Sequence, residues 1–339
     1  MGRFVRRALI SLSVIGVVGC QGVGVPTVEI PDQPIAVTYR DPELARKRAE
    51  SLQGDSTRPE PAPGIARVDD ITRFVTSFFG VSGGLAPVDP YAGELALLDP
   101  RTGKVRPVAS ALRGAVPLAW NSAYSRLLFT QPAAGRLQVF ELDTESGDVQ
   151  QITRGPEAHP RACYGPDGRF VVMAVASSRR GTEVRILITD PGGGGGVPLS
   201  LAPAAYSPAC APDGSAVAWI EPRRGGIETL VVRSPVLSGG PRAVAPGREP
   251  TFSPDGQWIA YSAPVRGEWK LWRVRPDGRG RAPIGKGINR EQRPAISPDG
   301  RLVVYVSELA HRQQLYLRRF DGTGDRILFA NGDGTNPVW

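Results

Sequence analysis

The chain has 339 residues and a formal net charge of +8. Removal of an N-terminal leader, residues 1–19, would take away three arginines and leave a net charge near +5, and we do not expect an exported protein with this modest excess to bind nucleic acid. The sequence has only two histidines and three cysteines, with no spacing typical of a metal site, so we expect no metal and no cofactor.

The first twenty residues, MGRFVRRALISLSVIGVVGC, predict an export signal. Three arginines precede an apolar run that is too short to span a membrane comfortably. The segment resembles a bacterial lipobox, which implies that Cys20 is diacylated and becomes the mature N-terminus. Gln21 then favours the outer membrane, with the protein facing the periplasm. The alternative is an ordinary signal peptide or an uncleaved anchor with an incidental cysteine.

Residues 20–70 are interpreted as a tether. The stretch 41–53 has the signals of a short helix, with Asp41 as N-cap, Pro42 at the first helical position and Gly54 after its end. We therefore expect a linker with one helix, followed by a folded domain over residues 71–339.

The folded domain contains a repeat. After a short apolar strand, the tripeptide Pro-Asp-Gly begins at residues 166, 212, 254 and 298, at intervals of 46, 42 and 44 residues, whereas the copy at 276 belongs to the second turn of its unit. A period of this length, with several short apolar strands in each unit, predicts a β-propeller with four strands per blade. Proline and glycine favour the turn and aspartate bonds the following backbone, so the aspartates are interpreted as turn residues without a further function: Asp167, Asp213, Asp255 and Asp299.

Two further stretches predict six blades. The segment VPLAWNSAYSRLLFT, residues 116–130, repeats the pattern with its turn eroded to Asn121-Ser122-Ala123. The last four residues, NPVW, align with the start of an inner strand, whereas the sheet expected over residues 71–109 lacks one. We therefore expect an all-β, six-bladed β-propeller in which residues 336–339 complete the first blade and close the ring.

The stretches PTFSPDGQWIAYSAP (250–264) and PAISPDGRLVVYVSE (294–308), with the closing NPVW, resemble the TolB-type six-bladed propellers and their wider WD40-like relatives. The resemblance covers about the last four-fifths of the chain. It implies a non-catalytic binding scaffold of the cell envelope, with an envelope protein or the cell wall as partner, and we expect a monomer. TolB proteins carry an α/β domain before the propeller, whereas only about fifty residues separate the leader from the first blade here.

The candidate site is one mouth of the central channel. In each blade, the residue before the inner-strand proline is expected to face the axis: Val116, Ser207, Glu249, Arg293 and Asn336, with His159 or Arg161 in the blade that has extra residues. The alternative is that these are ordinary loop residues hydrogen-bonded to their neighbours.

Two other functions stay open. A hydrolase or lyase acting on sugars or peptides would use His159, Glu249 and Arg293 as acid–base and anion-holding groups. A glycan or small-ligand sensor would use the same channel without catalytic geometry.

Two further features allow alternatives. Cys163 and Cys210 lie on neighbouring inner strands, where they are either a disulfide or two small buried residues. Between Arg266 and Arg293, nine basic residues accompany three acidic ones. This stretch is either a solvated blade rim or a field that attracts an anionic partner such as a glycan, a lipid headgroup or an acidic protein.

Overall fold

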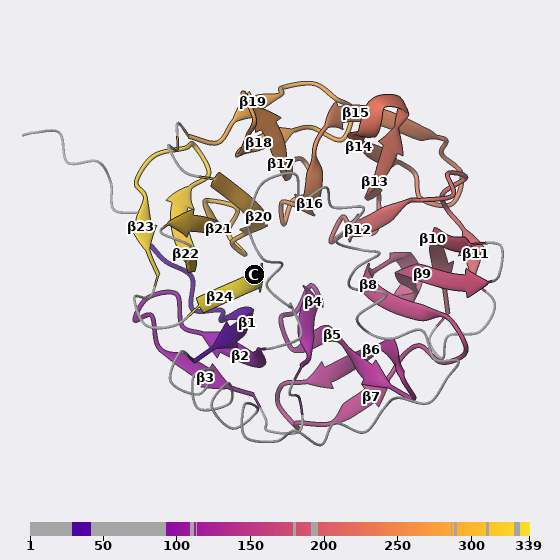
Figure 1. Cartoon of the computed structure of the whole chain (residues 1–339). Helices are drawn as coiled ribbons and strands as arrows, with labels where there is room; N and C mark the ends of the chain where they lie inside the picture. The colour runs from indigo at the N-terminus through magenta and orange to yellow at the C-terminus, as the bar shows by residue number, and fades with distance from the viewer. Residues whose placement is uncertain are drawn as a thin grey trace, which may run out of the picture.

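The structure, a computed structural model, describes residues 29–41, 93–108, 112, 114–178, 181–190, 196–285, 287, 290–309, 312–328 and 333–339. They form six four-stranded antiparallel sheets arranged as blades around one axis (Figure 1). The predicted six-bladed propeller is confirmed. Among the described residues, no helix is long and apolar enough to cross a membrane.

In every blade the first strand named lies at the channel and the last lies at the rim. Blade 1 has β24 (Asp333–Val338), β1 (Ile35–Arg40), β2 (Glu94–Leu98) and β3 (Val105–Pro107). Blade 2 has β4 (Val116–Trp120), β5 (Arg126–Ala133), β6 (Arg136–Asp143) and β7 (Val149–Gln151). Blade 3 has β8 (Ala158–Tyr164), β9 (Phe170–Ser178), β10 (Gly181–Thr189) and β11 (Val197–Pro198).

The other three blades follow the same order. Blade 4 has β12 (Tyr206–Cys210), β13 (Val217–Arg223), β14 (Ile227–Arg233) and β15 (Pro241–Pro246). Blade 5 has β16 (Arg248–Phe252), β17 (Ile259–Val265), β18 (Glu268–Val274) and β19 (Ala282–Pro283). Blade 6 has β20 (Arg290–Ile296), β21 (Leu302–Leu309), β22 (Arg312–Arg319) and β23 (Arg326–Ile327).

The first blade corrects the predicted domain boundary. The C-terminal strand β24 completes this blade, as expected, but its partner is β1, within the segment interpreted as a tether. Thr38 pairs with Thr335 on one side and with Leu95 on the other, so the propeller begins before residue 71. Residues 41–93 therefore join two neighbouring strands of the blade rather than preceding the domain. Residues 42–53 of the predicted helix and residues 71–92 of the predicted sheet lie outside the described residues.

The Pro-Asp-Gly turns have the structural role that was predicted. In blade 5 the hydroxyl of Ser253 donates to Asp255 and accepts from the backbone of Trp258 at 2.9 Å, while Asp255 accepts from the backbone of Gln257 at 3.1 Å. Blade 6 repeats these bonds at Ser297 and Asp299. Asp255 and Asp299 thus stabilise the hairpins between inner and second strands.

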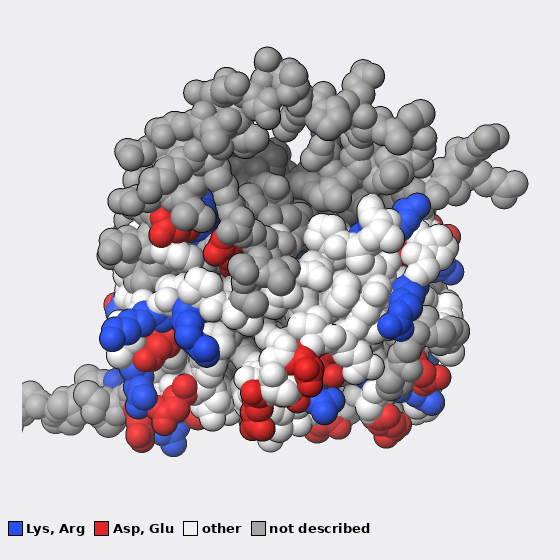
Figure 2. Space-filling view, turned by 90° about the horizontal axis from the view of Figure 1, so that it is seen from below, with Lys and Arg blue, Asp and Glu red and all other residues white. Residues whose placement is uncertain are grey.

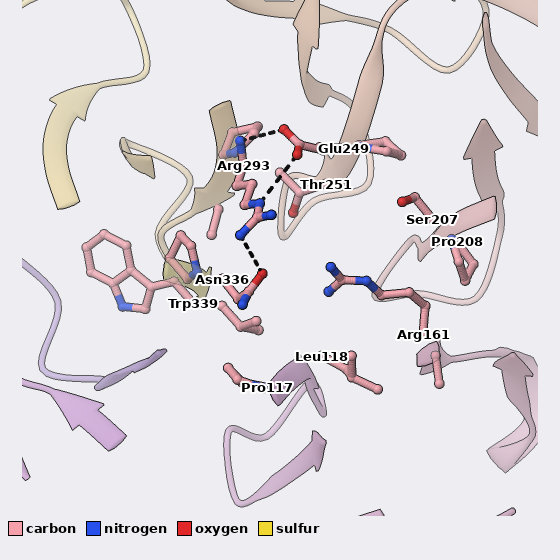
Figure 3. Close-up of a pocket in the computed structure, with 16 residues that line it drawn as sticks. Pro117, Leu118, Arg161, Ser207, Pro208, Glu249, Thr251, Arg293, Asn336 and Trp339 are labelled. Carbon is pink, nitrogen blue, oxygen red and sulfur yellow. Dashed lines mark hydrogen bonds and ion pairs between the residues drawn. The ribbon is translucent and has the colours of Figure 1, made fainter. Parts of the chain in front are cut away.

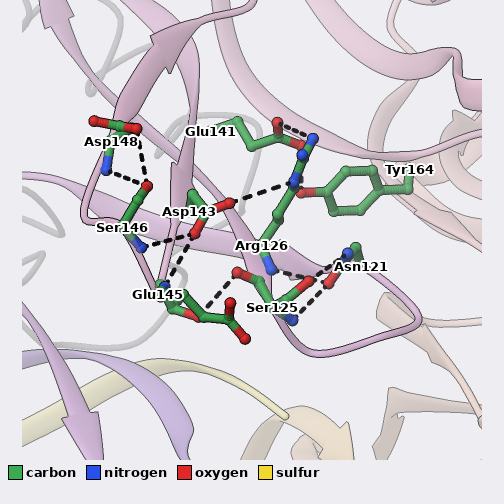
Figure 4. Close-up of polar contacts among 10 residues, drawn as sticks. Asn121, Ser125, Arg126, Glu141, Asp143, Glu145, Ser146, Asp148 and Tyr164 are labelled. Carbon is green, nitrogen blue, oxygen red and sulfur yellow. Dashed lines mark hydrogen bonds and ion pairs between the residues drawn. The ribbon is translucent and has the colours of Figure 1, made fainter.

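Blade 2 makes the same turn without the tripeptide. The side-chain oxygen of Asn121 accepts from the backbone N–H groups of Ser125 and Arg126, each at 2.9 Å (Figure 4). One asparagine thereby supplies the acceptor that serine and aspartate supply elsewhere.

The blades pack through apolar strand faces. The second strands are buried on both sides, as in Val303 and Val304, which belong to two different clusters of buried apolar residues. Blades 3 and 4 are also joined covalently, because Cys163 on β8 and Cys210 on β12 form a disulfide. The chain end is held as well, since the indole N–H of Trp339 donates to the carbonyl of Gln33 at 2.9 Å. These contacts fix the inner strands around the channel.

Candidate functional site: one mouth of the central channel

The inner strands surround a pocket of about 140 Å³ at the end of the propeller where these strands begin. Five of the predicted ring residues line this pocket: Arg161, Ser207, Glu249, Arg293 and Asn336. Figure 3 shows them pointing inward from different blades. The convergence that the sequence predicted is therefore present for these five residues.

A repeated backbone feature directs four of these side chains. Ser207, Glu249, Arg293 and Asn336 have φ between 50° and 56°, in the left-handed region that residues other than glycine seldom adopt. Each precedes a proline. In each of the four blades the pairing register between the inner and second strands shifts at this point. A bulge at the same place in four strands thus turns the residue before proline toward the channel.

Three of the four side chains are bonded to one another across blade boundaries. The backbone N–H of Arg293 donates to Glu249 Oε2 at 2.9 Å, and its Nε lies 3.4 Å from Glu249 Oε1. Arg293 Nη1 donates to Asn336 Oδ1 at 2.9 Å. The amide of Asn336 then donates to the hydroxyl of Thr38 at 3.2 Å. A polar chain therefore runs from blade 5 through blade 6 to blade 1.

Glu249 is held in its charged form. Burial acts to raise the pKa of its carboxyl, but the guanidinium groups of Arg248 and Arg293, with hydrogen bonds from Arg293 and from the Ser262 hydroxyl at 3.0 Å, bring the pKa below its ordinary value. Arg248 is itself fixed, because it lies over the ring of Trp269 at 3.6 Å and donates to Gln292 at 3.0 Å. The carboxylate is thus negatively charged at neutral pH.

A second carboxyl, that of Glu228, interacts electrostatically with Glu249, and its pKa is shifted in the opposite direction. Glu228 accepts a hydrogen bond from the hydroxyl of Tyr206. Burial raises the pKa of the Glu228 carboxyl above its ordinary value, although Tyr206 and Arg248 act in the opposite direction. Glu228 is not among the residues that line the pocket.

Arg161 enters the pocket from blade 3, opposite blade 6. Figure 3 shows its guanidinium directed toward the centre of the mouth, facing Arg293 and Asn336. The lining therefore holds two arginines and one glutamate, with Ser207, Thr251 and Asn336 as uncharged hydrogen-bonding groups. Such a mouth favours a ligand with an anionic group and several hydrogen-bonding partners.

Two predicted ring residues lie elsewhere. Val116 is 2% exposed and pairs with Thr130, and its place in the pocket is taken by Pro117 and Leu118, because the register shift in blade 2 follows Pro117. His159 is also buried, and Arg161 takes its place in blade 3 because the shift there lies between Ala158 and Arg161.

The surroundings of His159 keep it neutral. Its Nδ1 lies 3.2 Å from Gln138 Oε1, and this oxygen also accepts from the hydroxyl of Thr153 at 2.7 Å. Burial lowers the pKa of His159 to about 4. It borders a different cavity, of about 270 Å³, with Thr153 and Glu157, so it does not join Glu249 and Arg293 in one site.

The sequence reasoning missed Thr38 and Arg248. Thr38 lies on a strand that was assigned to the tether, and Arg248 resembles any other arginine beside a strand. The predicted lipidation site, Cys20, lies outside the described residues.

No family model matches the chain, and no curated protein matches it. Solved structures do. A protein from Agrobacterium tumefaciens described as a TolB is 23% identical with a TM-score of 0.59, over 70% of this chain and 89% of that one. TolB from Acinetobacter baumannii is 17% identical with a TM-score of 0.62, over 91% of this chain and 67% of that one.

Hydrazine synthase from Kuenenia stuttgartiensis is 12% identical with a TM-score of 0.63, over 91% of this chain and 46% of that one. These identities establish a common fold and nothing further, since one propeller fold carries unrelated functions. The chain therefore has the six-bladed propeller fold of the TolB structures.

Proposed function

We propose that this protein is a non-catalytic binding scaffold of the cell envelope, which binds a protein partner at the channel mouth. The observation that carries the proposal is the chain of Glu249, Arg293 and Asn336, held by bulges in three blades and faced by Arg161. These groups are fixed before any ligand arrives, so a partner pays little of the cost of ordering them. The TolB-like fold supports a scaffold function by analogy.

The arrangement favours binding over catalysis. Glu249 is engaged by Arg293 and Ser262, and His159 lies in a separate cavity with its ring bonded to Gln138. A general acid–base pair needs groups within reach of the same substrate atom, and His159 does not share the pocket of Glu249 and Arg293. A hydrolase or lyase at this mouth would therefore have to work with Glu249 and Arg293 and without His159.

The proposed location follows from the leader. An export signal with Cys20 as the lipid-carrying residue would place the propeller in the envelope, anchored to the outer membrane and facing the periplasm. Labelling of cells with a palmitate analogue tests this part: wild-type protein should carry the label and Cys20→Ser should not. A labelled Cys20→Ser protein would contradict it.

Crosslinking in intact cells tests the function. A photoreactive amino acid is placed at Ser207, on the mouth, and in a second strain at Val149, which is 45% exposed on the outer strand of blade 2. We expect one envelope protein to be captured from the mouth position and not from the outer position. The same capture should be lost when Glu249→Ala and Arg293→Ala are added.

The double variant could also lose capture because it unfolds. A second variant that does not touch the bonded chain is therefore needed. Ser207→Arg leaves the bonded chain intact and adds a bulky charge to the mouth. Loss of capture with Ser207→Arg, probed from a neighbouring position such as Thr251, supports the proposal. Capture that persists in a folded Ser207→Arg protein, or equal capture from Val149, would overturn it.

A further inference from the structure

A second charged surface lies at the opposite end of the propeller, where blades 4 and 5 meet beside the Pro-Asp-Gly turns. Five arginines form it, and they are called the arginine patch below: Arg242, Arg273, Arg275, Arg279 and Arg281. Three come from the turn between β18 and β19 and one from each neighbouring strand, β15 and β18. Arg242 Nη2 donates to the carbonyl of Pro276 at 3.1 Å, which brings the two blades together.

Aromatic rings orient the arginines. The guanidinium carbons of Arg273 and Arg275 lie 5.1 Å and 4.6 Å from the ring centre of Trp258, and that of Arg281 lies 4.5 Å from the ring of Trp272. Stacking on an indole leaves the N–H edge of a guanidinium free to point outward and reduces the freedom it would lose on binding.

The positive charge of the patch exceeds the negative charge around it. Asp277 lies 3.8 Å from Arg279, whose side chain is 85% exposed, and Asp321 on the neighbouring blade interacts electrostatically with Arg273. Among the described residues, no carboxylate lies within ion-pair distance of Arg242, Arg275 or Arg281, and all three are exposed. The side of the propeller shown in Figure 2 differs, because acidic and basic residues are interspersed there.

The shape of the patch indicates the kind of partner. Three of the arginines lie on a turn and two on strands, and none of the five lines the cavities at the channel or beside His159. Its two tryptophans, Trp258 and Trp272, are half-buried, and each ring is stacked on at least one arginine. The large apolar side chains that are exposed in the described residues lie outside it: Val149, Val197, Leu201, Ile227, Leu237 and Ile327.

We propose that the arginine patch binds the phosphate groups of anionic lipids at a bilayer surface. A guanidinium matches a phosphate through two parallel hydrogen bonds, and several spaced guanidinium groups match a layer that presents many phosphates. A protein partner would need an apolar centre to bury, whereas the apolar groups of the patch are two half-buried rings that are already stacked on arginines. The channel mouth lies at the other end of the inner strands, so it would face away from the bilayer.

Hydrogen–deuterium exchange of the full chain tests the proposal. The protein is bound to vesicles of phosphatidylcholine alone or of phosphatidylcholine with phosphatidylglycerol. A lipid anchor would insert into both kinds of vesicle, so a difference between the two vesicles reports binding by the patch and not by an anchor. We expect residues 273–282 to be protected only on the vesicles with phosphatidylglycerol, and we expect 0.5 M salt, with a Debye length of about 4 Å, to remove this protection.

The variant Arg275→Ala with Arg279→Ala should lose the protection. The matched control, Arg223→Ala with Arg224→Ala, removes the same charge from exposed positions at the other end of blade 4 and should keep it. Equal exchange of residues 273–282 on both vesicles would overturn the proposal. Protection by soluble polyglutamate but not by phosphatidylglycerol would also overturn it and assign the patch to an acidic protein.

Discussion

The backbone N–H of Arg293 donates to the carboxylate of Glu249 across the boundary between blades 5 and 6, with 2.9 Å between the nitrogen and Oε2. A main-chain donor cannot be removed by substitution of its side chain. Glu249 therefore keeps one partner in any Arg293 variant, whereas loss of the Glu249 charge affects the backbone and the side chain of Arg293 together.

We expect Glu249→Gln to lower the free energy of unfolding by about 1–2 kcal/mol at pH 7, because a partly exposed charged hydrogen-bond pair is worth about this much. The folded-state pKa of Glu249 is depressed, so its stabilisation is complete above the ordinary value of 4.5 and is lost as the pH falls through the lowered value. Urea unfolding at pH 7 and in acid measures both. The difference from wild type should shrink in acid, and a constant difference would contradict the assignment.

The neutral state of His159 is also testable. Its pKa is lowered to about 4 in the folded protein, while the unfolded chain takes up a proton near 6.5. Stability should therefore decrease as the pH falls from 6.5 toward 4, and His159→Gln should remove that part of the slope. NMR titration of the imidazole should find it still neutral at pH 5.5. A charged ring at that pH would mean that the histidine is accessible after all.

The disulfide between Cys163 and Cys210 closes a loop of 47 residues between blades 3 and 4. Constraint of the unfolded chain by such a loop is worth about 2–4 kcal/mol, so a reducing agent should lower the free energy of unfolding by this amount. The double variant Cys163→Ser with Cys210→Ser should be less stable from the start and should not respond to reduction. A response in the double variant would show that the reagent acts elsewhere.

Arg318 is 1% exposed and donates to Glu291, Tyr305, Asp325 and the carbonyl of Ile284. Arg318→Met would leave Glu291, which is 2% exposed, without its cation. We expect a loss of about 3–5 kcal/mol in urea unfolding, since an unpaired buried charge costs this much. Arg301→Met, at an exposed position on the same blade, should change the stability by about 0.5 kcal/mol or less. Similar losses in both variants would rule out this explanation.

The spacing of four Pro-Asp-Gly turns was enough to predict the blades, because the same turn recurs at the same place in each unit. The strand Ile35–Arg40 could not be found in this way. Its neighbours β24 and β2 are distant in the sequence, and no Pro-Asp-Gly turn joins it to either of them. A strand whose partners are both remote leaves little local signal.

The residues at the mouth were predicted correctly in the blades whose inner strands share one bulge geometry. They were not predicted where the register of the inner strand differs. Ser207, Glu249, Arg293 and Asn336 share one backbone geometry, so alignment of the repeats placed them correctly. Val116 and His159 also precede a proline, but the register shifts of β4 and β8 put other residues at the channel. A shift of one or two residues in the position of a bulge decides which side chain faces the axis. The position of the bulge cannot be recognised from the residue before proline alone.

The four equal bulges have a consequence for how this protein could change over time. Serine, glutamate, arginine and asparagine occupy the same left-handed position in four blades, so the backbone there accepts side chains of different size and charge. The bulge in the strand directs each side chain toward the channel, whichever residue occupies the position. A single amino-acid substitution there changes only the chemistry of the group that is presented. The set of partners accepted at the mouth could therefore be altered by single substitutions at these positions, while the apolar faces that hold the ring together stay as they are.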